Sequence, residues 1–307
     1  MTVTTSACPL CGGGLRQASG VRRRWGLLEC AGCDHVMAPA VQGTAADGEA
    51  LQREHFGDAF TSTYDGWTRL WDRANARRVR RIVAGAVAPG TSVLEIGPGH
   101  GGVLSALAAA GYRVQGLELS PAVAQATSRR SGVPVRVATV AIHAREAPGA
   151  YGAIVARHVL EHMVDPVAAL EAVHALLAPG GVAYVAVPNV DAPESALPGW
   201  TGYQPYHLHY FAPVRVRRVF ERAGFTVLTL RTREPFSGWV NAIVNSVRGG
   251  RPAAPADSTA GPRPIVVGAY HLIRLLAGSA ATPLRAVQAW SGRGEEIEIL
   301  ARKPEAA

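Results

Sequence analysis

The sequence lacks any long apolar run, and its first residues lack the pattern of an export signal. Although 48% of its 307 residues are hydrophobic, no uncharged apolar stretch reaches the roughly 18 residues of a membrane span. The longest candidate, residues 265–281, is interrupted by His271 and Arg274. The first residues contain no basic segment followed by an apolar one, so we expect no secretory signal. These absences predict a cytoplasmic protein with no membrane span.

Lysine is almost absent. Lys303 is the only lysine, and arginine supplies the rest of the 31 basic residues behind a formal charge of +8. Together with the abundant alanine and glycine, this bias is typical of a GC-rich genome. A solvated arginine surface explains the charge more simply than a face that follows phosphates. We therefore expect no nucleic-acid partner, and the composition indicates no particular oligomeric state.

Cysteine is scarce, but its spacing is informative. Cys8 and Cys11 form one C-x2-C pair, and Cys30 and Cys33 form a second after an 18-residue gap. Thiolates at this spacing sit on two tight turns and can close a tetrahedral site around one Zn²⁺ ion. A closed four-sulfur site leaves no open coordination position, so we expect a structural zinc ribbon in which His35 is not a ligand. Two disulfides are the competing interpretation, which a cytoplasmic setting disfavours.

Beyond the ribbon, strand and helix patterns alternate. We expect residues 1–40 to form the ribbon, 41–88 linking helices, and 89–307 the main domain, with a helical lid insertion at about 232–292. The alternation predicts a doubly wound, Rossmann-like α/β domain with a parallel sheet. The expected strands are 91–96, 113–118, 134–138, 152–157, 182–187, 225–231 and 296–302, and expected helices begin at residues 101, 121, 166 and 213.

The turn after the first of these strands reads VLEIGPGHGG and has the spacing G-x-G-x-x-G. With Glu118 at the end of the next strand, that spacing is typical of a dinucleotide site. Glu95, however, lies two residues before the first glycine, and a buried carboxylate beside a pyrophosphate would be repelled by it. S-adenosylmethionine carries an ammonium group and no phosphate, so Glu95 would not be repelled by it. We therefore expect S-adenosylmethionine as the ligand, and a dinucleotide is the alternative. We expect Glu95 to face the ammonium group, the backbone of Gly97, Gly99 and Gly101 to approach the amino acid and ribose, and Glu118 to bind the ribose hydroxyls.

Four motifs taken together resemble a known family. VLEIGPGHGG, GLELSP, RHVLEHMVDP and LLAPGGVAYVAVPN occur in the order and spacing of class I S-adenosylmethionine-dependent methyltransferases, over about residues 75–231 and the final strand. The resemblance implies a seven-stranded sheet whose last strand, 296–302, returns antiparallel between its neighbours. It also implies that Leu119 and His158 line the cofactor site. The family often holds the adenine amine with an acidic residue after the third strand, and VATVAIHARE has none in the usual place.

The ribbon narrows this resemblance. The chain resembles deoxysugar C-methyltransferases and related tailoring enzymes of natural-product pathways in three features. These are the four cysteines, the segment CAGCDHVMAP and the downstream segment HLHYFAP. The resemblance implies O- or C-methylation of a small-molecule acceptor, such as a specialised metabolite or a sugar. The alternative is an RNA methyltransferase that binds its substrate with the ribbon and the arginines.

Several histidines are candidates for the general base. A hydroxyl or acidic carbon acceptor must lose a proton, which suits a histidine near neutral pH. His207 is the first choice because it begins the HLxxF pattern, and His209 and His162 are the other candidates. HVLEH also matches an inverse zinc-protease pattern, but that motif requires a helix, whereas this segment leaves a strand. A divalent metal bound by His158, Glu161 and His162 is an alternative to a purely structural role of this loop.

Overall fold

The computed structural model describes residues 7–39, 66–234, 238–249, 276 and 279–305. The part of the linking helices that is expected before residue 66, and residues 250–275 of the predicted insertion, lie outside the described residues. The chain divides into two compact units. Unit 1 comprises residues 1–42, 188–216 and 231–298, and unit 2 comprises residues 43–187, 217–230 and 299–307. Among the described helices, none is both long and apolar enough to cross a membrane.

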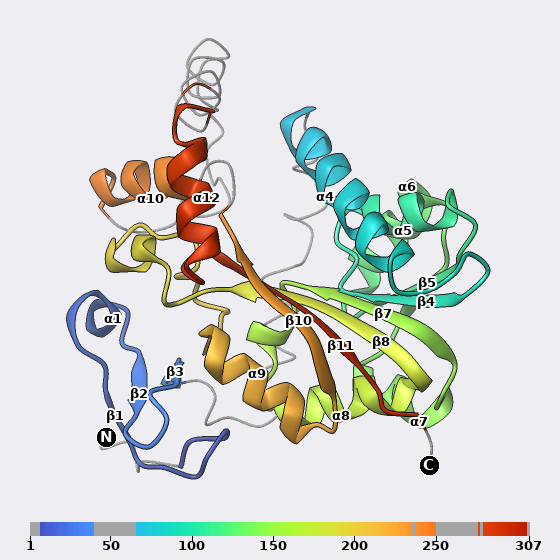
Figure 1. Cartoon of the computed structure of the whole chain (residues 1–307), viewed down its shortest axis with the longest axis horizontal. Helices are drawn as coiled ribbons and strands as arrows, with labels where there is room; N and C mark the ends of the chain where they lie inside the picture. The colour runs from blue at the N-terminus through green and yellow to red at the C-terminus, as the bar shows by residue number, and fades with distance from the viewer. Residues whose placement is uncertain (1–6, 40–65, 235–237, 250–275, 277–278, 306–307) are drawn as a thin grey trace. The chain divides into compact units, whose positions relative to one another are not determined.

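A seven-stranded sheet organises the α/β fold, as the sequence predicts (Figure 1). Its strand order is β10-β11-β8-β7-β4-β5-β6, and β4 pairs in parallel with both β5 and β7. The last strand, β11, runs antiparallel between β8 and β10, which confirms the expected return. The strands are β4 (Ser92–Ile96), β5 (Arg113–Glu118), β6 (Val135–Val137), β7 (Tyr151–Arg157), β8 (Leu177–Pro188), β10 (Thr226–Arg233) and β11 (Glu296–Arg302).

Helices cover both faces of the sheet in unit 2 (Figure 1). One face carries α4 (Gly66–Ala84), α5 (Gly102–Ala108) and α6 (Pro121–Ser131), and the other carries α7 (Val140–Glu146) and α8 (Pro166–Leu176); α9 (Pro213–Arg222) precedes β10. The core forms where α4 and α5 pack on the sheet, through side chains such as Val79, Val83, Val93 and Val103.

Local sequence signals explain where these helices begin. Ser120 caps α6 by accepting a hydrogen bond from the Val123 amide at 3.4 Å, and Pro121 occupies the first turn. Asp165 caps α8 in the same way. The helix α7 is not among the elements that the sequence predicts. It begins at a Thr139 cap, but its seven residues are too few to show a clear helical period.

Unit 1 is built around a second, four-stranded sheet. β1 (Leu15–Gln17), β2 (Leu28–Cys30) and β3 (Val36–Met37) form an antiparallel series, with α1 (Gly20–Arg24) between β1 and β2. The fourth strand, β9 (His209–Tyr210), comes from far along the chain and pairs antiparallel with β3. A core of Leu27, Val36, Trp200, Tyr203 and Tyr210 joins these segments. From the predicted insertion, unit 1 also contains α10 (Gly238–Val247) and α12 (Thr282–Trp290).

Candidate active site

The glycine-rich turn follows β4 directly and has backbone angles that glycine adopts most easily. Gly97, Gly99 and Gly101 have φ values of 63°, 53° and 84°. A Cβ atom on Gly97 would lie only 2.6 Å from Cγ2 of Val159. Thr127 of α6 donates a hydrogen bond from Oγ1 to the Gly99 carbonyl, which fixes the turn. The result is a backbone surface without side chains at the carboxyl end of β4, where open α/β sheets bind ligands.

Glu95 lies in β4 just before this turn and is only 4% exposed. Its Oε2 atom has no hydrogen-bond partner among the described residues. Burial raises the pKa of Glu95 well above its usual value; the nearby Arg157 lowers it, and Asp72 of α4 adds to the rise. A buried carboxylate oxygen without a partner is costly, so this atom is suited to a cationic group of a ligand.

Glu118 ends β5, and the following backbone holds its carboxylate. Its Oε1 atom accepts hydrogen bonds from the amides of Leu119 at 2.7 Å and Ser120 at 3.0 Å. Burial raises the pKa of Glu118, and these two amides oppose the rise. Because both bonds use Oε1, the carboxylate is oriented without engaging Oε2 in either of them. An oriented carboxylate at the end of β5 is suited to accept hydrogen bonds from hydroxyl groups.

The HVLEH segment follows β7 as a loop. Its residues Leu160–His162 form a single 3₁₀ turn, η2, so the two histidines do not share one face of an α-helix, as expected. His158 has a φ of 53°, and its Nδ1 lies 3.3 Å from Oε1 of the fully buried Glu161. His162 is also buried. Since Val159 lies against Gly97, this loop is a neighbour of the glycine turn.

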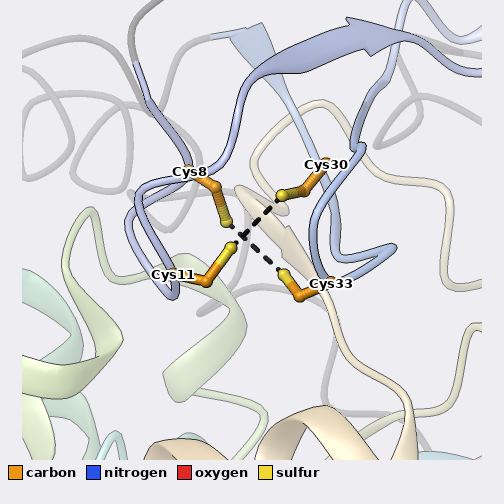
Figure 2. Close-up of side chains that lie close together, drawn as sticks. All are labelled: Cys8, Cys11, Cys30 and Cys33. Carbon is orange, nitrogen blue, oxygen red and sulfur yellow. Dashed lines mark hydrogen bonds between the residues drawn. The ribbon is translucent and has the colours of Figure 1, made fainter.

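The four cysteines converge in unit 1 (Figure 2). None forms a disulfide, and their sulfur atoms all lie within 4.8 Å of one another. Sγ of Cys8 lies 3.8 Å from that of Cys33, and Sγ of Cys11 lies 3.4 Å from that of Cys30. A tetrahedral Zn²⁺ ion with bonds of about 2.3 Å places its ligand atoms roughly 3.8 Å apart. The geometry fits a closed four-sulfur metal site and gives no support to the disulfide alternative.

His207 and His209 lie in different surroundings within unit 1, although both are buried. Nδ1 of His207 lies 2.7 Å from the carbonyl oxygen of Gly202. A carbonyl only accepts hydrogen bonds, so Nδ1 is the donor and the lone pair of the neutral ring is on Nε2. His209 instead begins β9, and its Nδ1 lies 2.9 Å from Nε2 of His35. His207 therefore lies beside a carbonyl group of its own loop, whereas His209 lies beside a histidine of the ribbon.

A buried polar cluster in unit 1 is absent from the sequence-based predictions. Gln288 of α12 donates to Glu194 at 2.9 Å and to Glu234 at 2.8 Å, while Thr201 donates to Glu295 at 2.6 Å. Burial raises the pKa of Glu234 to about 9, and Glu194 and Glu295 add to the rise. The bonds of Gln288 connect residues 54 and 94 positions apart. No local spacing signals such a cluster.

Comparisons with known proteins identify the family of this chain. A family model described as a methyltransferase domain matches residues 67–230. A curated relative, the ubiquinone biosynthesis O-methyltransferase of Xanthomonas campestris pv. campestris, is 31% identical over 160 residues. That alignment covers 50% of this chain and 67% of the relative.

Two solved structures have a similar fold. An S-adenosylmethionine-dependent methyltransferase from Archaeoglobus fulgidus aligns with a TM-score of 0.52 and 15% identity, over 76% of this chain and 94% of that one. The 1,6-didemethyltoxoflavin-N1-methyltransferase of Burkholderia thailandensis, solved with 1,6-didemethyltoxoflavin and S-adenosylhomocysteine, aligns with a TM-score of 0.52 and 16% identity, over 89% and 97%. At these identities the likeness concerns the fold. Because the family model spans more than half of the chain and includes the glycine turn after β4, this chain belongs to the methyltransferase domain family and is an S-adenosylmethionine-dependent methyltransferase.

Proposed function

We propose that the enzyme methylates an oxygen or carbon atom of a small-molecule acceptor, with a histidine as general base. The observation that carries the proposal is the buried His207, whose ring is oriented by the Gly202 carbonyl at 2.7 Å. That bond leaves the lone pair on Nε2, the atom that would take a proton from a hydroxyl or an acidic carbon. His209 is ranked second because His207, and not His209, begins the HLxxF pattern, and His162, buried in unit 2, is third.

The cofactor role is assigned to the residues around the ends of β4 and β5. Glu95 would accept hydrogen bonds from the ammonium group, since its Oε2 is buried without a partner among the described residues. Gly97, Gly99 and Gly101 would present backbone to the amino acid and ribose, and Glu118 would bind the ribose hydroxyls. Leu119 and His158 would line the same site. When bound, S-adenosylmethionine supplies a sulfonium methyl group, so the chain's main task is to position the acceptor.

The acceptor class is supported by names and by motifs. The curated relative is named for ubiquinone biosynthesis, and the Burkholderia enzyme was solved with 1,6-didemethyltoxoflavin; both names refer to small molecules. The four cysteines and HLHYFAP favour an acceptor of the natural-product or sugar type. The alternative, an RNA substrate, would use the formal charge of +8, which a solvated arginine surface explains more simply.

The zinc role follows from the donor set. Four thiolates around one Zn²⁺ ion would leave it no position for a substrate. We therefore assign any bound zinc to the folding of the ribbon and not to the methyl transfer.

A labelling experiment tests this function. The wild-type chain is incubated with methyl-labelled S-adenosylmethionine and a panel that contains a catechol, a phenolic polyketide, a nucleoside-diphosphate sugar and total RNA. We expect label in a small molecule and none in RNA. Label in RNA, with binding that weakens steeply between about 50 and 200 mM salt, would overturn the small-molecule assignment.

A further inference from the structure

We propose that His35 is a positioning residue: it holds His209, and with it the segment 202–211 that carries His207. In this view the ribbon is a support for the general base and not a separate substrate-binding module. The inference rests on the proposed role of His207, and every contact that carries it lies within unit 1.

The second cysteine turn sets the position of His35. The Asp34 amide donates to the Cys30 carbonyl at 2.8 Å, and the Cys30 amide donates to the His35 carbonyl at 2.9 Å. Asp34 has a φ of 54°, in the left-handed region, which closes the turn tightly. Cys33 therefore leads directly into His35 and β3. The turn that carries Cys30 and Cys33 and the backbone of His35 therefore form one short segment that these hydrogen bonds hold together.

The imidazole of His35 contacts the far segment through its edge. Its Nε2 lies 2.9 Å from Nδ1 of His209, and the ring centroids are 5.2 Å apart with an interplanar angle of 26°, so the two rings meet edge to edge. Phe211 lies against both rings, at 5.4 Å from His35 and 5.7 Å from His209. His35 and His209 are 0% and 1% exposed, so water does not compete for this hydrogen bond.

The backbone pairing alone is too short to fix the segment firmly. β3 and β9 have only two residues each, paired as Val36 with Tyr210 and Met37 with His209. In so short a pairing a slip of one residue costs few hydrogen bonds, but it would turn every side chain of β9 to the opposite face. The bond between His35 and His209 exists in one register only. It therefore specifies which side chains of the 202–211 segment point to which side.

Contacts on both sides of this pair attach the same segment to the ribbon. Arg215, just after the segment, donates from Nε to the Cys33 carbonyl at 2.9 Å. Trp25, which follows α1, stacks on Tyr203 at 5.4 Å. Since Gly202 and Tyr203 are adjacent, this stacking also fixes the carbonyl that orients His207. The ribbon thus contacts the segment near its start, at its strand and just beyond its end.

The test compares two substitutions of His35 in the zinc-loaded, full-length chain. His35→Phe keeps an aromatic ring beside His209 and Phe211 but removes the hydrogen bond, while His35→Gln keeps an amide nitrogen near the place of Nε2. Arg16→Gln, at an exposed position of the ribbon, is the control. Amide hydrogen exchange, zinc content, and kcat and KM with the acceptor that the wild type methylates fastest are measured for each.

We expect His35→Phe to retain its zinc and to increase exchange within residues 202–211 by about tenfold or more, with no change in residues 93–118. The kcat should fall about 10- to 100-fold with the KM for S-adenosylmethionine unchanged, because a misplaced base slows the transfer step. His35→Gln should keep most of the exchange protection of residues 202–211 and most of the wild-type kcat. Unchanged exchange and kcat in His35→Phe would overturn the inference.

A second variant covers the case in which His35→Phe does not fold. His209→Phe removes the same bond from the other side while keeping an aromatic ring, and it should increase exchange within residues 33–38; unchanged exchange there would also overturn the inference. Failure of the wild type to methylate any acceptor would count against the proposed function alone, because hydrogen exchange requires no acceptor.

Discussion

Units 1 and 2 depend on different kinds of interaction. The core that α4 and α5 form on the sheet of unit 2 consists largely of valine and alanine side chains, and buried charged residues such as Glu95 and Glu161 lie at the candidate site. In unit 1, aromatic rings share the interior with buried histidines, carboxylates and the four cysteines. Apolar burial has no preferred direction, whereas buried polar groups stabilise only in one geometry. Cofactor binding in unit 2 should therefore survive changes that disable unit 1, and four predictions test this contrast.

The largest effect is expected from loss of a cysteine ligand. Protein purified without chelator should contain close to one zinc ion per chain, and Cys30→Ser should lose it. Structural zinc contributes about 10–16 kcal/mol of apparent binding free energy in small zinc-binding peptides, so the ribbon should become sensitive to protease. Calorimetry should still detect S-adenosylmethionine binding. A parallel loss of cofactor affinity would mean that the two units are not independent in this respect.

Removal of the proposed base should have the next largest effect. His207→Ala should lower turnover by about 10²- to 10⁴-fold while it spares cofactor affinity, because a general base acts only in the transfer step. Tyr206→Phe, which keeps the neighbouring ring, is the control and should stay within a few-fold of wild type. Near-normal turnover in a variant that lacks both His207 and His209 would show that the acceptor needs no base or that His162 supplies it.

A substitution of Glu95 should affect cofactor binding in unit 2 and leave unit 1 unchanged. Glu95→Gln keeps the shape of the side chain but removes the charge, so S-adenosylmethionine affinity should fall by about 1.5–3 kcal/mol, the range for a hydrogen bond to a charged group. Calorimetry measures the difference, and zinc content should be unchanged. The exposed Glu171 of α8 offers a control, Glu171→Gln, with expected wild-type affinity. Equal affinities in wild type and Glu95→Gln would contradict the assigned role.

The smallest effect concerns the pH dependence of stability in unit 1. The pKa of Glu234 is about 9, above the value of about 4.3 for an unfolded glutamate, so the native state holds a proton that the unfolded state releases. This stabilisation is complete below about pH 4 and is lost as the pH rises through about 9, by at most about 1.4 kcal/mol per pH unit.

Glu234→Gln should flatten that slope between about pH 6 and 9, measured by urea unfolding. In this variant Gln288 can still donate to the side chain at position 234, and the Arg285 side chain can still donate to the backbone carbonyl there. The matched control, Glu221→Gln at an exposed position, should leave the slope as in wild type. An unchanged slope in Glu234→Gln would mean that another group binds the proton.

Sequence patterns predicted the strands and helices of unit 2 well because each of them carries its own local pattern of apolar, glycine and capping residues. β5 and β11 coincide with the predicted ranges, and the glycine turn follows the expected strand. β8 begins at Leu177 and not at residue 182, because the Pro-Gly-Gly segment at residues 179–181 lies inside an irregular strand that pairs with β7. The positions of Glu95 and Glu118 followed from spacing alone.

The candidate site in unit 1 was less predictable. The sequence placed the cysteines in one cluster because C-x2-C turns are local, and it singled out His207 by a short motif. It gave no indication that His35 meets His209, since 174 residues separate them and neither carries a pattern that refers to the other. The carboxylates around Gln288 are equally distant in sequence. Contacts of this kind arise from tertiary packing, which local patterns do not encode.

The pairing of β3 with β9 also has a consequence for synthesis of the chain. At about 5–20 residues per second, a ribosome needs roughly 9–35 s to extend from His35 to His209, 174 residues later. During this interval the cysteines have all emerged and can take up a metal ion. The outer edge of β3, however, has no partner strand, and the aromatic residues that will cover Leu27 and Val36 have not been made. Open strand edges and bare apolar surface attract other chains, so the nascent ribbon is most prone to aggregate in the period before the arrival of β9.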